Sequence, residues 1–214
     1  MSIRKFALCV IAALTLAGCA AEEVWAPDDV VARAAYTFDG PSTVTLLTMI
    51  SNRNGAGGHS ALLIDGSQRV LYDPAGSWRH PDIPERNDVL FGMSPAYLDF
   101  YMDYHARETF HVVVQTVEVS RATADALIAN VQAQGAAAPA YCARSISAAL
   151  SRTPGFETVG QSFFPRSVLA DFGALPGVTT TQVFDDDSDD NVELLIAQAR
   201  QRALQDTVDT VLGN

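Results

Sequence analysis

The chain is almost without lysine. Lys5 is the only lysine among 214 residues, and acidic residues outnumber basic ones by 25 to 14, which gives a formal net charge of −11. Binding to nucleic acid or to an anionic membrane surface depends on clustered lysine and arginine side chains. The composition therefore argues against both kinds of partner.

Cysteine is also scarce, and the motifs that hold metal ions or nucleotides are absent. The sequence has three cysteines, no CxxC or HExxH pattern, and no glycine-rich phosphate loop. His80, His105 and His111 lack metal-ligand spacing, so we interpret them as surface or capping residues. We expect no metal ion and no cofactor.

The first residues have the pattern of an export signal. Arg4 and Lys5 precede the apolar stretch "FALCVIAALTLAG", which is too short to cross a bilayer comfortably. It ends in "LAGC", residues 16–19, which resembles the lipobox of bacterial lipoproteins. The resemblance implies a signal peptide over residues 1–18, lipid such as palmitate on Cys19, and anchoring in the bacterial cell envelope on the periplasmic side. The alternative is an ordinary secretory signal that is cleaved nearby.

Export would leave Cys142 as the one free thiol. Cys9 would leave with the signal and Cys19 would carry the lipid, so Cys142 would have no partner in its own chain. An unpaired thiol in an oxidising compartment is exposed to oxidation, which favours a reactive role. The alternative is a buried cysteine that serves only as a small apolar side chain.

Hydrophobic patterning predicts one α+β domain over residues 41–214, after a tether over residues 19–40. Strands come first, and helices follow with strands between them, which favours an antiparallel sheet packed against helices. Residues 74–88 are expected to form a long loop. The expected strands are 42–51, 59–64, 69–73, 109–119 and 178–184; the expected helices are 94–108, 120–135, 138–152, 164–175 and an amphipathic helix from residue 192 that packs on the domain.

His59 and Cys142 are the main candidate catalytic residues. His59 follows "GAGG" and begins a predicted strand, and Cys142 lies in "PAYCARSISAAL", where Pro139 suits the first turn of a helix. Free backbone N–H groups at a helix N-terminus stabilise both a thiolate and a developing oxyanion. The pattern therefore predicts a thiol nucleophile with a histidine base. Ser60 is a poor nucleophile for His59, because adjacent strand residues point to opposite faces.

Asp73 is the candidate that orients His59. The two predicted strands that carry these residues form a hairpin. With a three-residue turn, Ile64 pairs with Val70 and Asp73 lies on the same face as His59; with two or four residues, Asp73 points away. The alternative is a turn-capping aspartate in "YDPAG".

"GHSALLIDGSQRVLYDPAGSW", followed much later by "YCARSISAAL", resembles the permuted papain-fold proteins of the NlpC type. This group includes lecithin:retinol acyltransferase-like enzymes and several bacterial lipoproteins. The resemblance covers residues 43–175 and implies a circularly permuted papain-like fold with His59, Asp73 and Cys142 as the catalytic set. Asp73 departs from the pattern, because the third residue of the family is commonly histidine, asparagine or glutamine and lies slightly earlier.

These features predict an envelope lipoprotein that acts as a thiol hydrolase or acyltransferase on an amide or ester bond. A peptidoglycan stem peptide is the leading substrate and a lipid-like acyl compound the second, and we expect a monomer. Tyr141 and Trp78 are candidates for substrate binding, with ordinary packing as the alternative. The alternative function is a non-catalytic binding module on the same fold.

The acidic run "DDDSDDNVE", residues 185–193, superficially resembles a calcium loop. An EF-hand that starts at Asp185 requires glycine at 190 and glutamate at 196, where this chain has Asp190 and Ile196. We interpret the run as a solvated acidic loop at a helix N-terminus. Weak calcium binding is the alternative.

Overall fold

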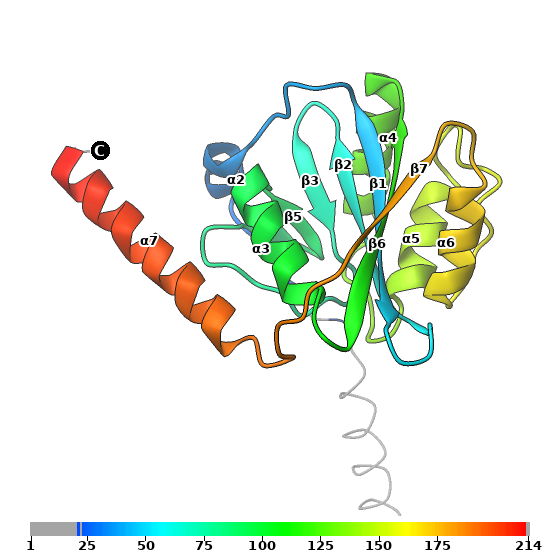
Figure 1. Cartoon of the computed structure of the whole chain (residues 1–214). Coiled ribbons are helices and arrows are strands. Elements are labelled where there is room, and N and C mark those ends of the chain that lie inside the picture. The colour runs from blue at the N-terminus through cyan, green and yellow to red at the C-terminus, as the bar shows by residue number, and fades with distance from the viewer. Residues whose placement is uncertain (1–20, 22, 213–214) are drawn as a thin grey trace, which may run out of the picture.

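The computed structural model describes residues 21 and 23–212, so the predicted signal peptide and Cys19 lie outside the described residues. The strands of the described part form one antiparallel sheet in the order β4-β5-β3-β2-β1-β6-β7, and helices lie on both of its faces (Figure 1). The expected α+β class with an antiparallel sheet is therefore confirmed.

The elements follow the predicted order closely. The strands are β1 (Thr43–Ser51), β2 (Gly57–Asp65), β3 (Arg69–Tyr72), β4 (Glu85–Arg86), β5 (Val89–Phe91), β6 (Phe110–Glu118) and β7 (Thr179–Val183). The helices are α2 (Asp28–Ala34), α3 (Pro95–His105), α4 (Arg121–Gln132), α5 (Cys142–Leu150), α6 (Pro165–Gly173) and α7 (Val192–Leu212).

Alternation along the central strands divides the hydrophobic core in two. On β2, Leu62 and Ile64 belong to the cluster that contains side chains of α4, α5 and α6, whereas Ala61 and Leu63 belong to the cluster that contains Tyr101 of α3. Successive strand residues point to opposite faces. Both faces of β2 are therefore buried, which explains why its sequence is continuously apolar rather than alternating.

The strands β4 and β5 were not expected: β4 falls within residues 74–88, which read as a loop, and residues 89–93 were assigned to no element. Each is very short, and they are joined by Asn87 and Asp88, which both have positive φ, 46° and 68°. Two such residues in succession form the type of tight turn that joins antiparallel strands. Strands of two or three residues carry too little periodicity to be recognised in a sequence.

The segment 19–40 was expected to be a tether, but from Trp25 onward it lies along the sheet. The guanidinium of Arg86 lies 4.8 Å from the ring centroid of Trp25, and its Nε donates to the carbonyl oxygen of Ala26 at 2.8 Å. Further along, the guanidinium of Arg69 lies 4.4 Å from the ring centroid of Phe38. Arginines of the sheet therefore hold this segment through cation–π contacts and hydrogen bonds.

Helix α7 packs on the domain only through its first turns and then extends away from it (Figure 1). Leu194 and Gln198 are buried, whereas Leu195 and Ile196 are exposed. The expectation that the whole amphipathic helix packs on the domain is therefore wrong. Among the described residues, no helix combines the length and apolar character that crossing a membrane requires.

Candidate active site

The register of the β2–β3 hairpin brings Asp73 to His59. Ile64 pairs with Val70, so the turn has three residues, which is the alternative that places Asp73 on the same face as His59. The Nε2 atom of His59 lies 2.6 Å from Oδ1 of Asp73. A carboxylate only accepts, so Nε2 carries the proton and donates it to this bond. The other ring nitrogen, Nδ1, is left free to face a second group.

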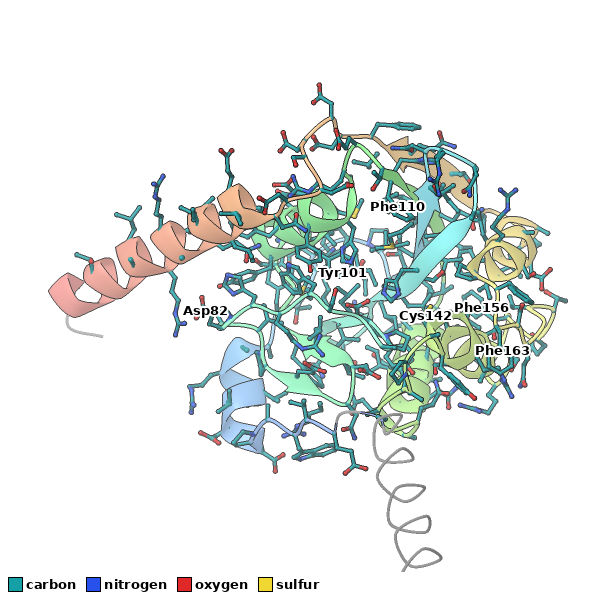
Figure 2. The ribbon with its side chains drawn as sticks, turned by 90° about the horizontal axis from the view of Figure 1, so that it is seen from below. Asp82, Tyr101, Phe110, Cys142, Phe156 and Phe163 are labelled. Carbon is teal, nitrogen blue, oxygen red and sulfur yellow. The ribbon has the colours of Figure 1, made fainter. Side chains whose placement is uncertain are left out.

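Cys142 reaches His59 from the opposite face of the sheet. The β2–β3 pairing ends at Leu62 and Tyr72, which leaves the first half of β2 without a β3 neighbour on that edge. The N-terminal end of α5 lies at this position, where His59 and the backbone N–H groups of Ser60 and Ala143 are near enough to the Cys142 thiol to lower its pKa. Seen from below, Cys142 and Tyr101 both lie toward the middle of the molecule (Figure 2).

Helix α5 begins at Cys142, and not at Pro139 as the sequence suggested. Ala140 has a positive φ of 67°, and this left-handed residue separates Pro139 from the helix. Cys142 is therefore the first helical residue, where the backbone N–H groups have no partner within the helix. The N–H of Ala143 is one of the groups that lower the pKa of the thiol.

The charges at this site favour an ionised pair. Burial raises the pKa of the Cys142 thiol, but the hydrogen bond and positive charge of His59 and the neighbouring N–H groups outweigh it and hold the pKa below its ordinary value. Burial lowers the pKa of His59, but the charge and hydrogen bond of Asp73, together with Cys142, raise it to about 10. The two shifts therefore favour the thiolate and imidazolium form of the pair more strongly than in the free side chains.

Asp73 is held in place on several sides. The phenol of Tyr101 donates to its Oδ1 at 3.0 Å. Burial raises the pKa of Asp73, but the positive charge of His59 outweighs it, so the pKa stays below its ordinary value. A Cβ at Gly76 would lie 1.9 Å from Oδ2 of Asp73, so the backbone at this position passes too close to the carboxylate for any other residue.

Asp88 links Asp73 to the segment that precedes Cys142. Its carbonyl oxygen accepts from the N–H of Asp73 at 2.8 Å, and its Oδ2 accepts from the N–H of Ala137 at 2.6 Å. Burial, with the charges of nearby carboxylates, raises the pKa of Asp88 to about 6. Sequence reasoning missed Asp88, because its role depends on the turn between β4 and β5.

His105 lies beside the site, which its interpretation as a surface or capping residue did not anticipate, although its ring does bond to a carbonyl oxygen near the end of α3, as a capping residue does. Its ring centroid lies 6.0 Å from that of His59, and its Nδ1 donates to the carbonyl oxygen of Tyr101 at 2.8 Å. Burial lowers the pKa of His105 to about 4, so this ring is neutral and Nε2 carries a lone pair. Tyr101 and His105 are four residues apart in one predicted helix, a spacing that could have suggested a shared face.

The other two histidines differ from each other. His80 is buried and lies 4.8 Å, between ring centroids, from Tyr97, so the surface interpretation is wrong for it. The ring of His111 stacks on exposed Phe184 and bonds to Oδ1 of Asn52, which agrees with a surface position.

The two candidates for substrate binding have different surroundings. Tyr141 is 46% exposed next to the nucleophile, and its ring lies edge-on to that of Phe163 at 5.1 Å. Trp78 is 0% exposed and packs against Tyr101, so its expected place in an open cleft is wrong and the packing alternative is right. Only Tyr141 is accessible to a substrate.

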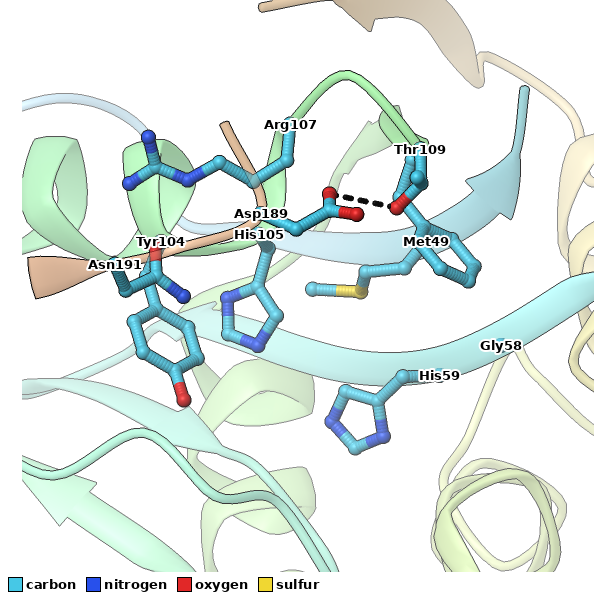
Figure 3. A pocket seen from close by; sticks show the side chains of 10 residues that line it. Met49, Gly58, His59, Tyr104, His105, Arg107, Thr109, Asp189 and Asn191 are labelled. Atoms are coloured by element: carbon cyan, nitrogen blue, oxygen red, sulfur yellow. Dashed lines mark hydrogen bonds between the residues drawn. The ribbon is translucent and has the colours of Figure 1, made fainter. Parts of the chain in front are cut away.

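A cavity of about 350 Å³ adjoins His59 on the α3 side (Figure 3). Its walls come from the start of β2, the end of α3, the start of β6 and the acidic run. The lining residues include Met49, His59, Tyr104, His105, Phe110 and Asp189.

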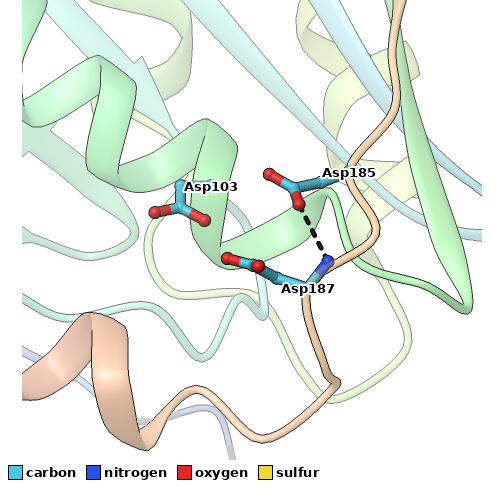
Figure 4. A group of neighbouring side chains, drawn as sticks. All are labelled: Asp103, Asp185 and Asp187. Carbon is cyan, nitrogen blue, oxygen red and sulfur yellow. Dashed lines mark hydrogen bonds between the residues drawn. The ribbon is translucent and has the colours of Figure 1, made fainter.

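The acidic run is exposed, as expected, but it is anchored to the domain. Carboxylate oxygens of Asp103, Asp185 and Asp187 lie within 4.8 Å of one another (Figure 4). The guanidinium of Arg107 lies 3.2 Å from both Asp103 and Asp187. Its positive charge therefore already balances part of this cluster.

Comparison of the chain with family models, with curated proteins and with solved structures found no match in any of the three.

Proposed function

We propose that the chain is a thiol hydrolase or acyltransferase with a permuted papain-like arrangement. The observation that carries the proposal is the position of His59, which lies between the Asp73 carboxylate and the thiol of Cys142 at the first residue of α5. A nucleophile, a base and an orienting group in this order form the catalytic unit of acyl-transfer enzymes.

In the proposed reaction the Cys142 thiolate attacks the carbonyl carbon of an amide or ester, and a C–S bond forms. Backbone N–H groups at the start of α5 stabilise the negative charge on the carbonyl oxygen. The His59 imidazolium gives its proton to the leaving nitrogen or oxygen as that bond to carbon breaks. Water or another acceptor then gives a proton to His59 and attacks the thioester, which releases the thiolate.

A peptidoglycan stem peptide is the substrate that we propose first, and a lipid-like acyl compound second. The expected envelope location supports both. The exposed ring of Tyr141 beside the nucleophile offers an apolar contact to either one.

One observation favours the alternative of a non-catalytic binding module. Cys142 is only 6% exposed, as a structural cysteine is. The two functions differ in the ionisation of the thiol, because a structural cysteine in an apolar site is protonated and inert.

The rate of alkylation of Cys142 by iodoacetamide separates these functions. We expect the folded protein to react at pH 6 at least tenfold faster than free cysteine, because its thiol pKa is lowered whereas a free thiol, with a pKa of about 8.5, is protonated. His59→Gln removes the imidazolium and should slow the reaction, and His111→Gln is the matched surface control. Mass spectrometry locates the label. A wild-type rate no greater than that of free cysteine would overturn the proposal.

A further inference from the structure

A cluster of exposed aromatic side chains lies on the α5–α6 side of the molecule, next to the thiol. Tyr141, Phe163 and Phe164 are 46%, 51% and 71% exposed, and the rings of Tyr141 and Phe163 meet edge-on at 5.1 Å. Phe163 and Cys142 both lie in the right half of the view from below (Figure 2). Single apolar side chains are common on protein surfaces, whereas grouped ones mark a contact surface. We call these three residues the aromatic surface.

The backbone around the two phenylalanines is held in place by buried groups. Oγ of Ser147, a buried residue of α5, accepts from the N–H of Ser162 at 3.1 Å. Oγ of Ser162 accepts from the N–H of Phe164 at 3.1 Å, and Pro165, the first residue of α6, is buried. Turning the rings inward would break these bonds, which cost free energy to leave unmade. The exposure of the rings is therefore fixed by the fold.

The charges around the aromatic surface differ from those of the rest of the chain. Residues 137–170 contain three arginines and one glutamate, whereas the whole chain has a net charge of −11. Arg166 is exposed two residues after Phe164, and one of its N–H groups donates to the carbonyl oxygen of Gly55. Aromatic rings suit the boundary between lipid headgroups and acyl chains, and a guanidinium bonds well to phosphate. The net charge disfavours an anionic membrane, so a zwitterionic lipid surface fits best.

The point where the N-terminal segment joins the domain indicates the same partner. The carbonyl oxygen of Val24 accepts from the N–H of Asn87 at 2.9 Å. The next residue, Asp88, accepts from the N–H of Ala137, in the segment that leads to Tyr141. The N-terminal segment and the aromatic surface are therefore tied to one turn. Val24 is five residues after Cys19, and five residues span at most about 18 Å even when fully extended. Lipid on Cys19 would keep this turn close to the bilayer.

We propose that the aromatic surface docks on the bilayer that holds the acyl chains of Cys19. This inference rests on the expected lipid at that residue. The rings of Tyr141, Phe163 and Phe164 lie among the headgroups, and Arg166 donates to a lipid phosphate. Tyr141 immediately precedes Cys142, so docking brings the thiol side of the site next to the membrane.

Quenching of tryptophan fluorescence by brominated lipid tests this proposal. The full-length protein is reconstituted in phosphatidylcholine vesicles with or without bromine on the acyl chains, because bromine quenches tryptophan only at close range. The chain has two tryptophans. Trp25→Phe removes the one near the N-terminal segment, and Trp78 is buried and gives a constant background. In this background, Phe164→Trp should lose most of its added fluorescence in the brominated vesicles.

Phe38→Trp in the same background is the matched control. Phe38 lies 4.4 Å, from its ring centroid, from the guanidinium of Arg69, which pairs with Asp65 at the end of β2 opposite to His59. Its added fluorescence should be almost unchanged by bromine. Phe163→Trp should be quenched as Phe164→Trp is, and it keeps the test open if Phe164→Trp does not fold.

Each outcome decides for or against the docking surface. No quenching of Phe164→Trp and Phe163→Trp, or quenching of Phe38→Trp to the same extent, would overturn it. A protein that does not float with the vesicles in a density gradient would overturn the anchor and the docking surface together. None of these results bears on the proposed hydrolase or acyltransferase, which depends on the alkylation rate of Cys142.

Discussion

Single residues at this site have roles that depend on which of their atoms are already bonded. His59 uses Nε2 for Asp73, so only Nδ1 is left for the thiol. His105 uses Nδ1 for a carbonyl oxygen, so only Nε2 is left for a ligand. Two histidines with rings 6.0 Å apart therefore offer opposite properties, one a charged donor and the other a neutral acceptor. The difference follows from the carboxylate, which bonds to only one of them.

Tyr101 is the residue whose removal should loosen this arrangement. Burial and the charge of Asp73 raise the pKa of Tyr101 well above its ordinary value, so its phenol remains a donor. Tyr101→Phe leaves one fewer hydrogen bond on a buried carboxylate, and we expect the free energy of unfolding to fall by about 1.5–3 kcal/mol. Alkylation of Cys142 should also become slower, because Asp73 orients His59 less firmly.

Tyr104→Phe is the control for this prediction. Its hydroxyl lies 3.4 Å from Oγ of Ser77 at an exposed position on the same helix, so its loss should change stability by less than about 0.5 kcal/mol. Urea denaturation measures both variants. Equal effects of the two substitutions would show that the Tyr101 hydrogen bond does not hold Asp73.

At the scale of the elements, the geometry of the site depends on where β3 ends and on where α5 begins. If β3 continued past Tyr72, its backbone would occupy the edge of β2 that the N-terminal end of α5 now fills. The start of α5 at Cys142 aims its free N–H groups at that edge. Sequence patterning predicted both elements, but their ends shifted by one to a few residues, as helix and strand ends commonly do.

Helix α7 gives a prediction at this scale. Because only its first turns are buried, truncation after Arg202 should change the free energy of unfolding by less than about 0.5 kcal/mol. Leu194→Ala removes a side chain that is 7% exposed and should cost about 2 kcal/mol. Chemical denaturation of the two variants is the measurement. A truncation as costly as Leu194→Ala would mean that the distal half of α7 packs on the domain.

In the whole molecule, the groups of the site come from both faces of the sheet and meet at one of its edges. The side chains of His59, Asp73 and Tyr101 lie on the α3 face, whereas Cys142 belongs to the cluster of α4, α5 and α6. They meet only at the edge left open beyond β3. Catalysis of the proposed kind therefore requires both layers to be folded.

The proposed envelope anchor is also a property of the whole protein. The lipobox-like "LAGC" supports acylation of Cys19. In bacterial cells we expect the protein to sediment with membranes and to incorporate labelled palmitate, and Cys19→Ala should abolish both. Cys9→Ala, a cysteine in the same apolar stretch, is the matched control. Retention of label and of membrane association in Cys19→Ala would contradict the anchor.

The sequence alone determined which side chains could serve as nucleophile, base and orienting group, and it determined part of their arrangement. Strand alternation has a period of two residues and is local, so it predicted that His59 and Asp73 share a face once the turn has three residues. It also identified Cys142 at the start of a helix. The supporting groups on the α3 side were not identified, because a helix pattern tells which residues share a face but not what that face contacts.

Only the tertiary structure decided that the thiol meets the histidine. Cys142 and His59 are far apart in the chain and on elements that pack against opposite faces of the sheet, and no local pattern relates them. Their contact depends on where β3 ends, on the turn at Asn87 and Asp88, and on the bond from Ala137 to Asp88 that fixes the approach to α5. These are packing interactions between distant segments, and a one-dimensional pattern does not encode their geometry.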